Sequence, residues 1–503
     1  MTEYKVWLSL SRMTDIQKRL AGLGCLLTLV LAVLDMNIVS AATVAIVRDL
    51  DPAHGLDHLA WLVTAYALAA TAALPLYGKL CDVYGAKAVY LAAVTLFLTG
   101  SALCGTAGSM TWLIVFRALQ GIGGGGLMSV TIVVLAFLAP PEDRGRAGGM
   151  GGIVAGVGIV AGPLLGGLLV DHLSWRWIFY VNLPLGLAVL ATGALALRLP
   201  RQGTRRRIDY LGAALSAAAA VVLLLVTEWA GRDYAWGSPT ILSLIAADAV
   251  LVGAFVWRQA RAAEPILPLG LFRDRVVGTA LPLQFLAAFA GLTGPIVYTM
   301  IYLQAVKGVA AADAGLYLIP LAAGMTAAGL VSGALQGRGA GMTTFLVTGS
   351  AVTAVAVGLL SLLRTGTATP VLLADLFLLG VGQGQVVGTV VMLVQDAVPV
   401  SRLGVATTAI RFAQTLGSAV GTAVFGVILS RVTDSGSGDT RPSIAAMGAL
   451  PPAARRRAAE ALVSGVDAVF LTAAGVMLVA LALAVLLRAR RAEPVSPVPA
   501  LTK

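Results

Sequence analysis

The sequence predicts an all-α membrane protein with fourteen transmembrane helices, arranged as two pseudo-symmetric six-helix bundles plus an inserted two-helix hairpin. Of its 503 residues, 58% are hydrophobic and 12% are charged, whereas about 25% are charged in soluble proteins. This apolar surplus must face lipid, because a water-facing globule needs more polar surface. The other two observations are a regular succession of long apolar stretches and a motif that occurs twice. The composition excludes a soluble enzyme, a disordered chain, a collagen and a coiled coil.

The long apolar stretches define the expected spans. A hydrocarbon core of about 30 Å requires about 20 apolar residues of helix. An even number of spans places both termini on the same side of the membrane. The expected helices occupy residues 20–42, 59–77, 88–107, 111–135, 147–170, 177–197, 210–227, 240–257, 278–301, 314–335, 343–363, 371–394, 404–430 and 467–487.

The distribution of basic residues sets the expected orientation. Of the 35 Lys and Arg residues, 23 fall on the side of the termini, 10 on the other side and two within spans. Half of the outer ten lie in the loop 431–466, whose length weakens the positive-inside rule. We expect a multi-pass cell-membrane protein with both termini cytoplasmic and an uncleaved first helix. The net charge of +11 is then explained by basic residues on the cytoplasmic side, where they contact acidic headgroups of the lipid bilayer. We expect neither a nucleic-acid partner nor an obligate protein partner.

A glycine motif recurs in two helices that are far apart in the sequence. Residues 121–125 read Gly-Ile-Gly-Gly-Gly and precede Pro-x-x-Arg at 141–144, while 380–384 read Gly-Val-Gly-Gln-Gly and precede Pro-x-x-Arg at 399–402. This pairs helices 1–6 with helices 9–14 and leaves helices 7 and 8 as an insertion. Two such halves are typical of an alternating-access carrier. The expected divisions are a first bundle (1–197), a basic cytoplasmic linker (198–209), the inserted hairpin (210–257), a second bundle (258–487) with a long outer loop (431–466), and a cytoplasmic tail (488–503).

Two opposite charges are expected at the same depth in the first bundle. Asp35 in helix 1 and Arg117 in helix 4 each lie roughly 9 Å from the outer surface, at 1.5 Å per residue. Ionisable groups inside spans are costly, and so are functional candidates by default. If both helices face one cavity, Arg117 and a cationic substrate would each favour the ionised form of Asp35, which is a route to exchanging a proton for a cation. The alternative is an ion pair that only joins two helices.

Further polar residues are candidates in the spans of the second bundle and the hairpin. Asp375 is a possible second acidic subsite or a hydrated group near the interface. Asp248 serves either transport or assembly of the hairpin, and Arg411 either neutralises a carboxylate or extends to the membrane edge. Candidates for the substrate cavity, each also explicable as a helix-to-helix hydrogen bond, are Gln284, Tyr298, Gln383 and Gln385.

Several kinds of chemistry have no signature in the sequence. No GxxxxGK[ST] motif is present, so ATP does not drive the protein directly. The three histidines do not have metal-ligand spacing, and we expect no metal and no cofactor, with a proton gradient as the energy source. The glycine run at 121–126 lies inside an apolar span without a preceding strand, which argues against dinucleotide binding.

Four segments resemble motifs of the major facilitator superfamily, and specifically of its fourteen-helix drug/proton antiporter family. They occur in the expected order within the first 185 residues. The matching segments are GKLCDVYGAK (78–87), RALQGIGGG (117–125), GIVAGPLLGG (158–167) and WRWIFYVNLP (175–184). Two departures are Val83, where the family's loop motif has an arginine, and residues 34–44, which read LDMNIVSAATV where the family has a pattern like LDxTIVNVALP.

The resemblance implies roles for the matching residues. It associates Arg117 with proton transfer and the segment 158–167 with antiport. The spacing of glycines in helix 5, with its proline, is also that of a close-packing or bending surface, and ordinary tight packing is the alternative. The residues expected to act in gating and conformational change are Gly78, Asp82, Gly85, Lys87, Gly158, Gly162, Pro163, Gly166 and Gly167.

These observations predict a proton-coupled antiporter that exports amphiphilic, cationic drugs or antibiotics, with small-molecule drugs and protons as its partners. Alternatives are an importer or a lipid or metabolite carrier on the same fold, a proton-channel subunit of a membrane complex, and a sensor or receptor. The antiporter-like motif counts against an importer. All six lysines lie in tails, loops or helix edges, which counts against a proton channel. No soluble signalling domain accompanies the spans.

Overall fold

The computed structural model describes residues 13–51, 55–138, 162, 165–199, 208–230, 233–268, 270–309, 311–436 and 452–492. Within these ranges the regular elements are all helices. Thirteen of the described helices are long and apolar enough to cross a membrane. The remaining expected span, 147–170, lies for most of its length outside the described residues, although residues 165–172 are helical and a turn follows at 173. The protein is therefore an all-α, multi-pass membrane protein.

The first half contains α2 (Asp15–Leu50), α3 (Gly55–Tyr84), α4 (Ala86–Thr106), α5 (Met110–Leu138), α7 (Trp177–Tyr180) and α8 (Asn182–Ala196). The inserted hairpin consists of α9 (Tyr210–Trp229) and α10 (Pro239–Arg261). The second half contains α11 (Gly270–Arg273), α12 (Arg275–Gly291), α13 (Thr293–Ala305), α14 (Ala311–Ala314), η1 (Gly315–Leu318), α15 (Ile319–Gly337), α16 (Met342–Leu360), α17 (Thr369–Ala397), η2 (Val400–Arg402), α18 (Leu403–Gly436) and α20 (Pro452–Ala492).

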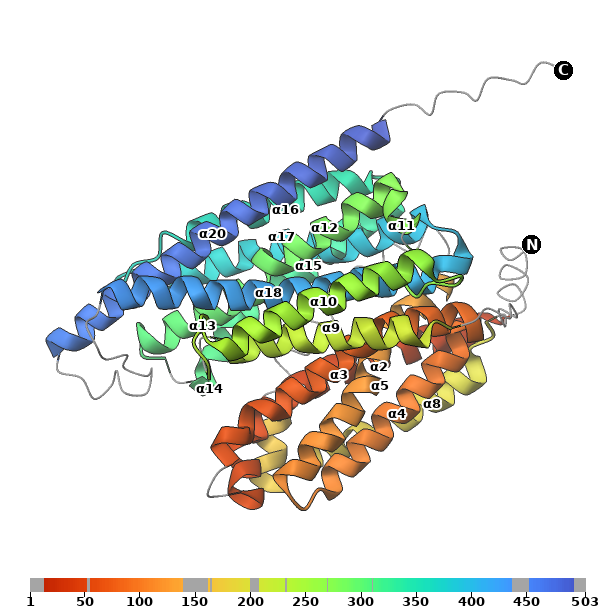
Figure 1. Ribbon diagram of the computed structural model, residues 1–503, viewed down its shortest axis with the longest axis horizontal. Helices are drawn as coiled ribbons and strands as arrows, with labels where there is room; N and C mark the ends of the chain where they lie inside the picture. Colours follow the sequence, from red (N-terminus) through yellow and green to blue (C-terminus); the bar gives the residue numbers. More distant parts are fainter. Residues whose placement is uncertain are drawn as a thin grey trace.

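The two bundles lie side by side, the first coloured red to yellow and the second green to blue (Figure 1). The end of α3 and the start of α18 meet, and this contact joins the two bundles. We call the end of the molecule where α3 ends, α18 begins and α20 ends the terminal end. The hairpin bridges the bundles because α9 contacts both α3 and α18, whereas α10 packs mainly on α9.

The glycine motifs explain how each bundle is assembled, and they occupy equivalent places in the two halves. A Cβ atom on Gly121 would lie 2.3 Å from the carbonyl oxygen of Tyr66 in α3, so α5 can approach α3 only with glycine there. A Cβ atom on Gly380 would likewise lie 2.1 Å from the carbonyl oxygen of Leu321 in α15. Thus α5 packs between α3 and α4 as α17 packs between α15 and α16. The repeat in the sequence reflects a repeat in packing.

Two expected elements differ in the structure. The expected helix 278–301 is interrupted at Leu292, because Pro295 has no N–H to bond the carbonyl of residue 291. The described parts of the expected outer loop 431–466 are helical: α18 continues to Gly436 and α20 begins at Pro452. The sequence PAARRRAAEALV at 452–463 consists largely of strong helix formers. An Arg456–Glu460 pair at i, i+4 (3.1 Å) adds a small stabilisation.

Candidate functional site

Asp35 and Arg117 form a buried ion pair inside the first bundle. The Arg117 Nη1 atom donates to Asp35 Oδ2 over 3.0 Å, and the two side chains are 2% and 0% exposed. Gln120, one turn after Arg117 in α5, donates to Asp35 Oδ1 over 2.8 Å. Asn182, the first residue of α8, donates to the same Oδ1 atom over 2.8 Å. Both oxygens of the carboxylate therefore have donors, as a buried carboxylate requires.

Further contacts hold the guanidinium of Arg117. Its Nε atom donates to the carbonyl of Leu62 over 3.2 Å, and Nη1 also donates to Gln120 Oε1 over 2.8 Å. The guanidinium carbon lies 4.3 Å from the centre of the Tyr66 ring, an arrangement that stabilises a desolvated cation. Because Leu62 and Tyr66 belong to α3, Arg117 connects α5 to α2 and α3.

Ser101 completes this network from α4. Its Oγ atom accepts from Gln120 over 3.2 Å and from Asn182 over 2.9 Å, and it donates to the carbonyl of Phe179 over 2.9 Å. All of these side chains are buried. We call Asp35, Arg117, Gln120, Ser101 and Asn182 the Asp35 network. It joins four transmembrane helices of the first bundle, so a change of charge at Asp35 alters the hydrogen bonds between all of them.

The helix that carries the antiporter-like motif approaches the Asp35 network at one described point. Gly162 is buried, and a Cβ atom there would lie 2.6 Å from Cβ of Asn37 in α2. The close contact of the two helices therefore requires glycine at 162. Gly166 is also buried, and a Cβ atom on Gly167 would meet nothing within 4 Å. Gly158 and Pro163 lie outside the described residues.

The candidates in the second bundle do not form a matching network. Gln383 is buried and donates to Thr353 over 3.5 Å, and Gln284 is buried with Oε1 unpaired among the described residues. Tyr298 donates to the carbonyl of Thr422 over 3.2 Å. Gln385 accepts from Thr348 over 2.7 Å, a bond between α17 and α16. These four residues lie in different contacts rather than in one cluster.

The three remaining charged candidates are also separate from one another. Asp375 is 8% exposed, and in the described part of the chain no ion pair is formed by it. Asp248 is half-buried on α10, and its Oδ1 atom is buried without a partner among the described residues. Arg411 donates to Gln414 one turn along α18, over 2.7 Å. Its contact is therefore local, and in the described residues no carboxylate pairs with it.

The loop motif at the end of α3 joins the two bundles. Asp82 is buried and accepts from the backbone N–H groups of Gly404 (3.1 Å) and Val405 (3.3 Å), the first turn of α18. A carboxylate is favourable there because the first N–H groups of a helix have no partner within the helix. Gly78 allows close packing, since a Cβ atom would lie 2.0 Å from Oγ1 of Thr408. We call this arrangement the α3–α18 contact.

Other residues of the loop motif stabilise the same end of the first bundle. Gly85 has φ of 88°, a conformation that glycine adopts readily, and it begins α4. The Lys87 Nζ atom donates to the carbonyls of Ala194 and Leu197 over 2.7 Å each, at the end of α8. Lys79 is 4% exposed and pairs with Glu264 over 2.7 Å, which ties α3 to the segment after α10.

The opposite end of the first bundle has an exposed ion pair beyond the span of α2. Asp49 accepts from Nε1 of Trp175 over 2.9 Å and from Nη1 of Arg176 over 2.7 Å. These hydrogen bonds, first that of Trp175, lower the pKa of the Asp49 carboxyl below its usual value. The WRW segment thus fixes the end of α2 beside the start of α7.

Three members of the Asp35 network were not among the residues expected from the sequence. Gln120 lies three residues after Arg117 and hence on the same helix face, a signal available from spacing alone. Asn182 lies within the segment 175–184, and its buried amide joins α8 to Asp35. Ser101 has no comparable signal, because α4 contains many small residues. Their importance becomes visible only when the helices are packed together.

Two similar six-helix bundles, with a buried charge network in one and a charge-capped contact between them, define a membrane transporter. The profile of the Major Facilitator Superfamily matches residues 25–422. The chain belongs to this superfamily, whose members are transporters and not enzymes.

Sequence relatives have the same family assignment. The chain is 37% identical over 440 residues to an uncharacterized MFS-type transporter of Mycobacterium tuberculosis, with 85% of this chain and 64% of the relative covered. The match thus spans less than two thirds of the mycobacterial relative. This chain is also 33% identical over 409 residues to the multidrug transporter protein MdtP of Bacillus subtilis, with 81% of this chain and 74% of the relative covered.

A solved structure shares the fold. The human organic anion transporter MFSD10 aligns with a TM-score of 0.64 and 16% sequence identity, over 93% of this chain and 99% of that chain. At this identity the likeness supports the fold and carries no information on the transported compound.

Proposed function

We propose that the protein is a proton-coupled antiporter that exports amphiphilic, cationic drugs or antibiotics across the cell membrane by alternating access, with both termini cytoplasmic. The observation that carries this proposal is the Asp35–Arg117 pair, fully buried within a bundle of a transporter. A carboxylate in that position is the natural place for a proton or an organic cation to bind alternately.

The exchange follows from the charge balance of the network. In the conformation described here the side chain of Asp35 is 0% exposed, so the network must open before a drug reaches it. A cation approaching Asp35 competes with any bound proton, and the proton is released. When Asp35 is protonated instead, Arg117 loses a charged partner and its interactions with Gln120 and Leu62 remain. The two states therefore differ in how tightly α2 is held to α5.

The relatives support drug export as the direction and substrate class. A relative in Bacillus subtilis that shares 33% identity is named a multidrug transporter protein. A second relative in that organism, 39% identical over 316 residues, is named multidrug resistance protein 3. The buried carboxylate favours cationic compounds among the drugs such proteins handle, because it supplies an opposite charge in a medium of low dielectric constant.

Transport into inverted membrane vesicles tests this proposal. With an acidic interior, vesicles that contain the wild-type protein should accumulate a cationic dye, and a protonophore should abolish accumulation. The Asp35→Asn variant keeps the shape of the side chain but cannot exchange a proton, and we expect less than about one tenth of the wild-type rate. Asp49→Asn, which changes an exposed carboxylate, is the control. Uptake that runs in the reverse direction, or an Asp35→Asn variant with wild-type coupling, would contradict the proposal.

A further inference from the structure

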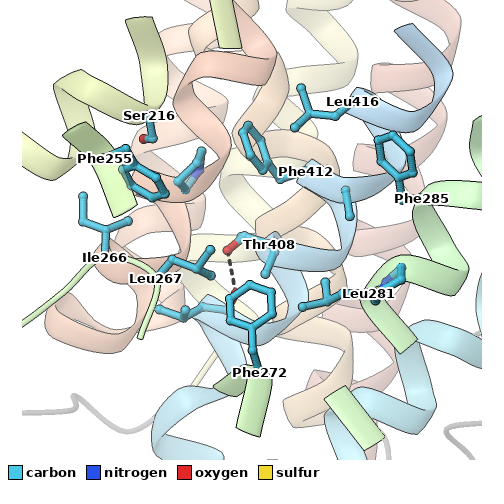
Figure 2. A pocket seen from close by; sticks show the side chains of 15 residues that line it. Ser216, Phe255, Ile266, Leu267, Phe272, Leu281, Phe285, Thr408, Phe412 and Leu416 are labelled. Atoms are coloured by element: carbon cyan, nitrogen blue, oxygen red, sulfur yellow. Dashed lines mark hydrogen bonds between the residues drawn. The ribbon is translucent and has the colours of Figure 1, made fainter. Parts of the chain in front are cut away.

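An apolar pocket of about 280 Å³ lies where the inserted hairpin meets both bundles. Its walls come from α3, α9, α10, α12 and α18, and from Ile266, Leu267 and Phe272 between the hairpin and α12. Figure 2 shows side chains of these elements pointing toward one another, with Phe255 on the hairpin side, Phe285 on the α12 side and Phe412 on α18 between them. The volume is close to the lower end of small-molecule sites, about 300 Å³.

The lining selects for a hydrocarbon ligand. Ser216 and Thr408 are the hydroxyl-bearing residues of the pocket wall, and both hydroxyls are already bonded to helix backbone. Ser216 donates to the carbonyl of Ala213 over 3.0 Å, and Thr408 donates to that of Gly404 over 3.0 Å. The remaining lining residues are aliphatic, proline or phenylalanine. A polar ligand would therefore lose its hydration without new hydrogen bonds, whereas an alkyl chain gains contact.

Arginines flank the pocket at the terminal end of the spans. Arg273 directly follows the lining residue Phe272, and Arg402 lies three residues before the lining residue Val405. Arg261 lies at the end of α10, with its guanidinium 4.7 Å from the Trp257 ring. The three arginines are exposed, and among the described residues none of them forms a salt bridge. They provide positive charge at the ends of candidate spans, where lipid headgroups are expected, next to a pocket that accepts hydrocarbon.

We propose that this pocket binds an acyl chain of an anionic phospholipid, with its headgroup among Arg261, Arg273 and Arg402. The pocket is built from membrane-spanning helices, and its hydrocarbon lining beside cationic side chains matches a lipid with an apolar tail and a negative head. The lipid chain contacts Pro75 of the first bundle, the hairpin and α18 of the second bundle at once. Its occupancy therefore favours the conformation in which the α3–α18 contact is formed.

A photo-crosslinking experiment with the full-length protein in phosphatidylcholine nanodiscs tests the proposal. The probe is phosphatidylglycerol with a diazirine in the middle of one acyl chain, and phosphatidylcholine with the same chain is its neutral counterpart. We expect the anionic probe to label residues 405–416 and 281–285 at least fivefold more than the neutral probe. Equal labelling by the two probes, or no labelling of these segments, would overturn the proposal.

Variants separate specific binding from general contact with lipid. Ala413→Phe on α18 and Ser216→Leu on α9 each place a larger side chain in the pocket wall, and each should reduce the anionic labelling at least fivefold. The double variant Arg261→Gln/Arg273→Gln should do the same by weakening headgroup binding. Ala92→Phe, which fills a separate apolar groove between α3 and α4, and Arg488→Gln should leave labelling unchanged. Labelling that persists after both filling substitutions overturns the proposal. The yield and melting temperature of each variant are measured as well, and normal values exclude misfolding as the cause of a loss of labelling.

Discussion

At the scale of residues, the protein places a carboxylate and a guanidinium in a fully buried position and satisfies both with hydrogen bonds. Removing two charges from water is expensive, and their mutual attraction compensates only when the remaining donors and acceptors are also paired. Gln120 and Asn182 provide that pairing for Asp35, and Leu62 provides it for Arg117. The cost of burying each charge is therefore offset mainly by its contact with the other.

The stability of this pair can be measured directly. Arg117→Leu leaves the Asp35 carboxylate buried and unpaired, and we expect a loss of about 3–5 kcal/mol in the free energy of unfolding. Asp35→Leu should be similarly destabilising because it leaves Arg117 unpaired. The double variant should recover much of the loss, and thermal melting of the purified variants measures the difference. Additive losses in the double variant would show that the two side chains act independently.

The neutral members of the Asp35 network should set the rate of transport. Gln120→Leu removes a donor to the Asp35 carboxylate. A hydrogen bond worth about 1 kcal/mol corresponds to about a fivefold change in an equilibrium constant, and we expect the rate of cation transport into vesicles to fall by about that factor. Gln395→Leu, which removes a buried bond to Thr407 in the second bundle, is the control. A rate that is unchanged in Gln120→Leu, or that falls equally in both variants, contradicts this role.

At the scale of elements, the two bundles are joined by the cap that Asp82 places on α18. Cys81 lies inside this contact, 3% exposed, and a Cβ atom on Gly404 would lie 2.9 Å from its Cβ atom. The thiol is therefore a natural reporter of opening at the terminal end.

We expect Asp82→Asn to open the α3–α18 contact more often. Loss of a charged cap costs about 1 kcal/mol, which corresponds to roughly a fivefold increase in the open population. In a background with Cys25→Ser and Cys104→Ser, a maleimide should label Cys81 about five times faster in the Asp82→Asn variant. Asp49→Asn should not change the rate, since Asp49 lies at the opposite end of the first bundle. An unchanged rate in Asp82→Asn would show that the cap does not control opening.

Most helix positions and one helix pairing could be predicted from the sequence, and the predictions that failed did so for physical reasons. Span positions follow from hydropathy, and the pairing of α5 with α17 follows from glycines, because close helix packing leaves few alternatives at those positions. The helix at 452–466, within the expected outer loop, was not predicted, because a run of alanine and arginine is polar enough to resemble a loop and yet forms helix. The helix break at Leu292 could not be predicted from the sequence, because a proline such as Pro295 does not by itself show where the helix is interrupted. Ser101 depends on packing between distant helices, which no local pattern encodes.

At the scale of the whole molecule, the described residues form a buried charged network in the first half and no counterpart of it in the second. The repeat gives α5 and α17 equivalent packing, yet the α17 positions that match Arg117 and Gln120 by the glycine register are Leu376 and Leu379. The two bundles therefore share the packing of their helices and differ in the polar residues that these helices carry. In the mechanism we propose, the first bundle exchanges the proton and the second bundle moves against it at the α3–α18 contact.

The most direct test of this account is proton release from the purified protein in weakly buffered detergent solution, without any membrane gradient. Adding a saturating cationic drug to the wild-type protein should release protons, because the drug displaces them from the Asp35 carboxylate. The Asp35→Asn variant lacks the carboxylate that exchanges the two ligands, so the same drug concentration should release no protons from it, while Asp375→Asn should behave as wild type. Drug-dependent release that is unchanged in Asp35→Asn would contradict the central claim that this residue exchanges proton and drug.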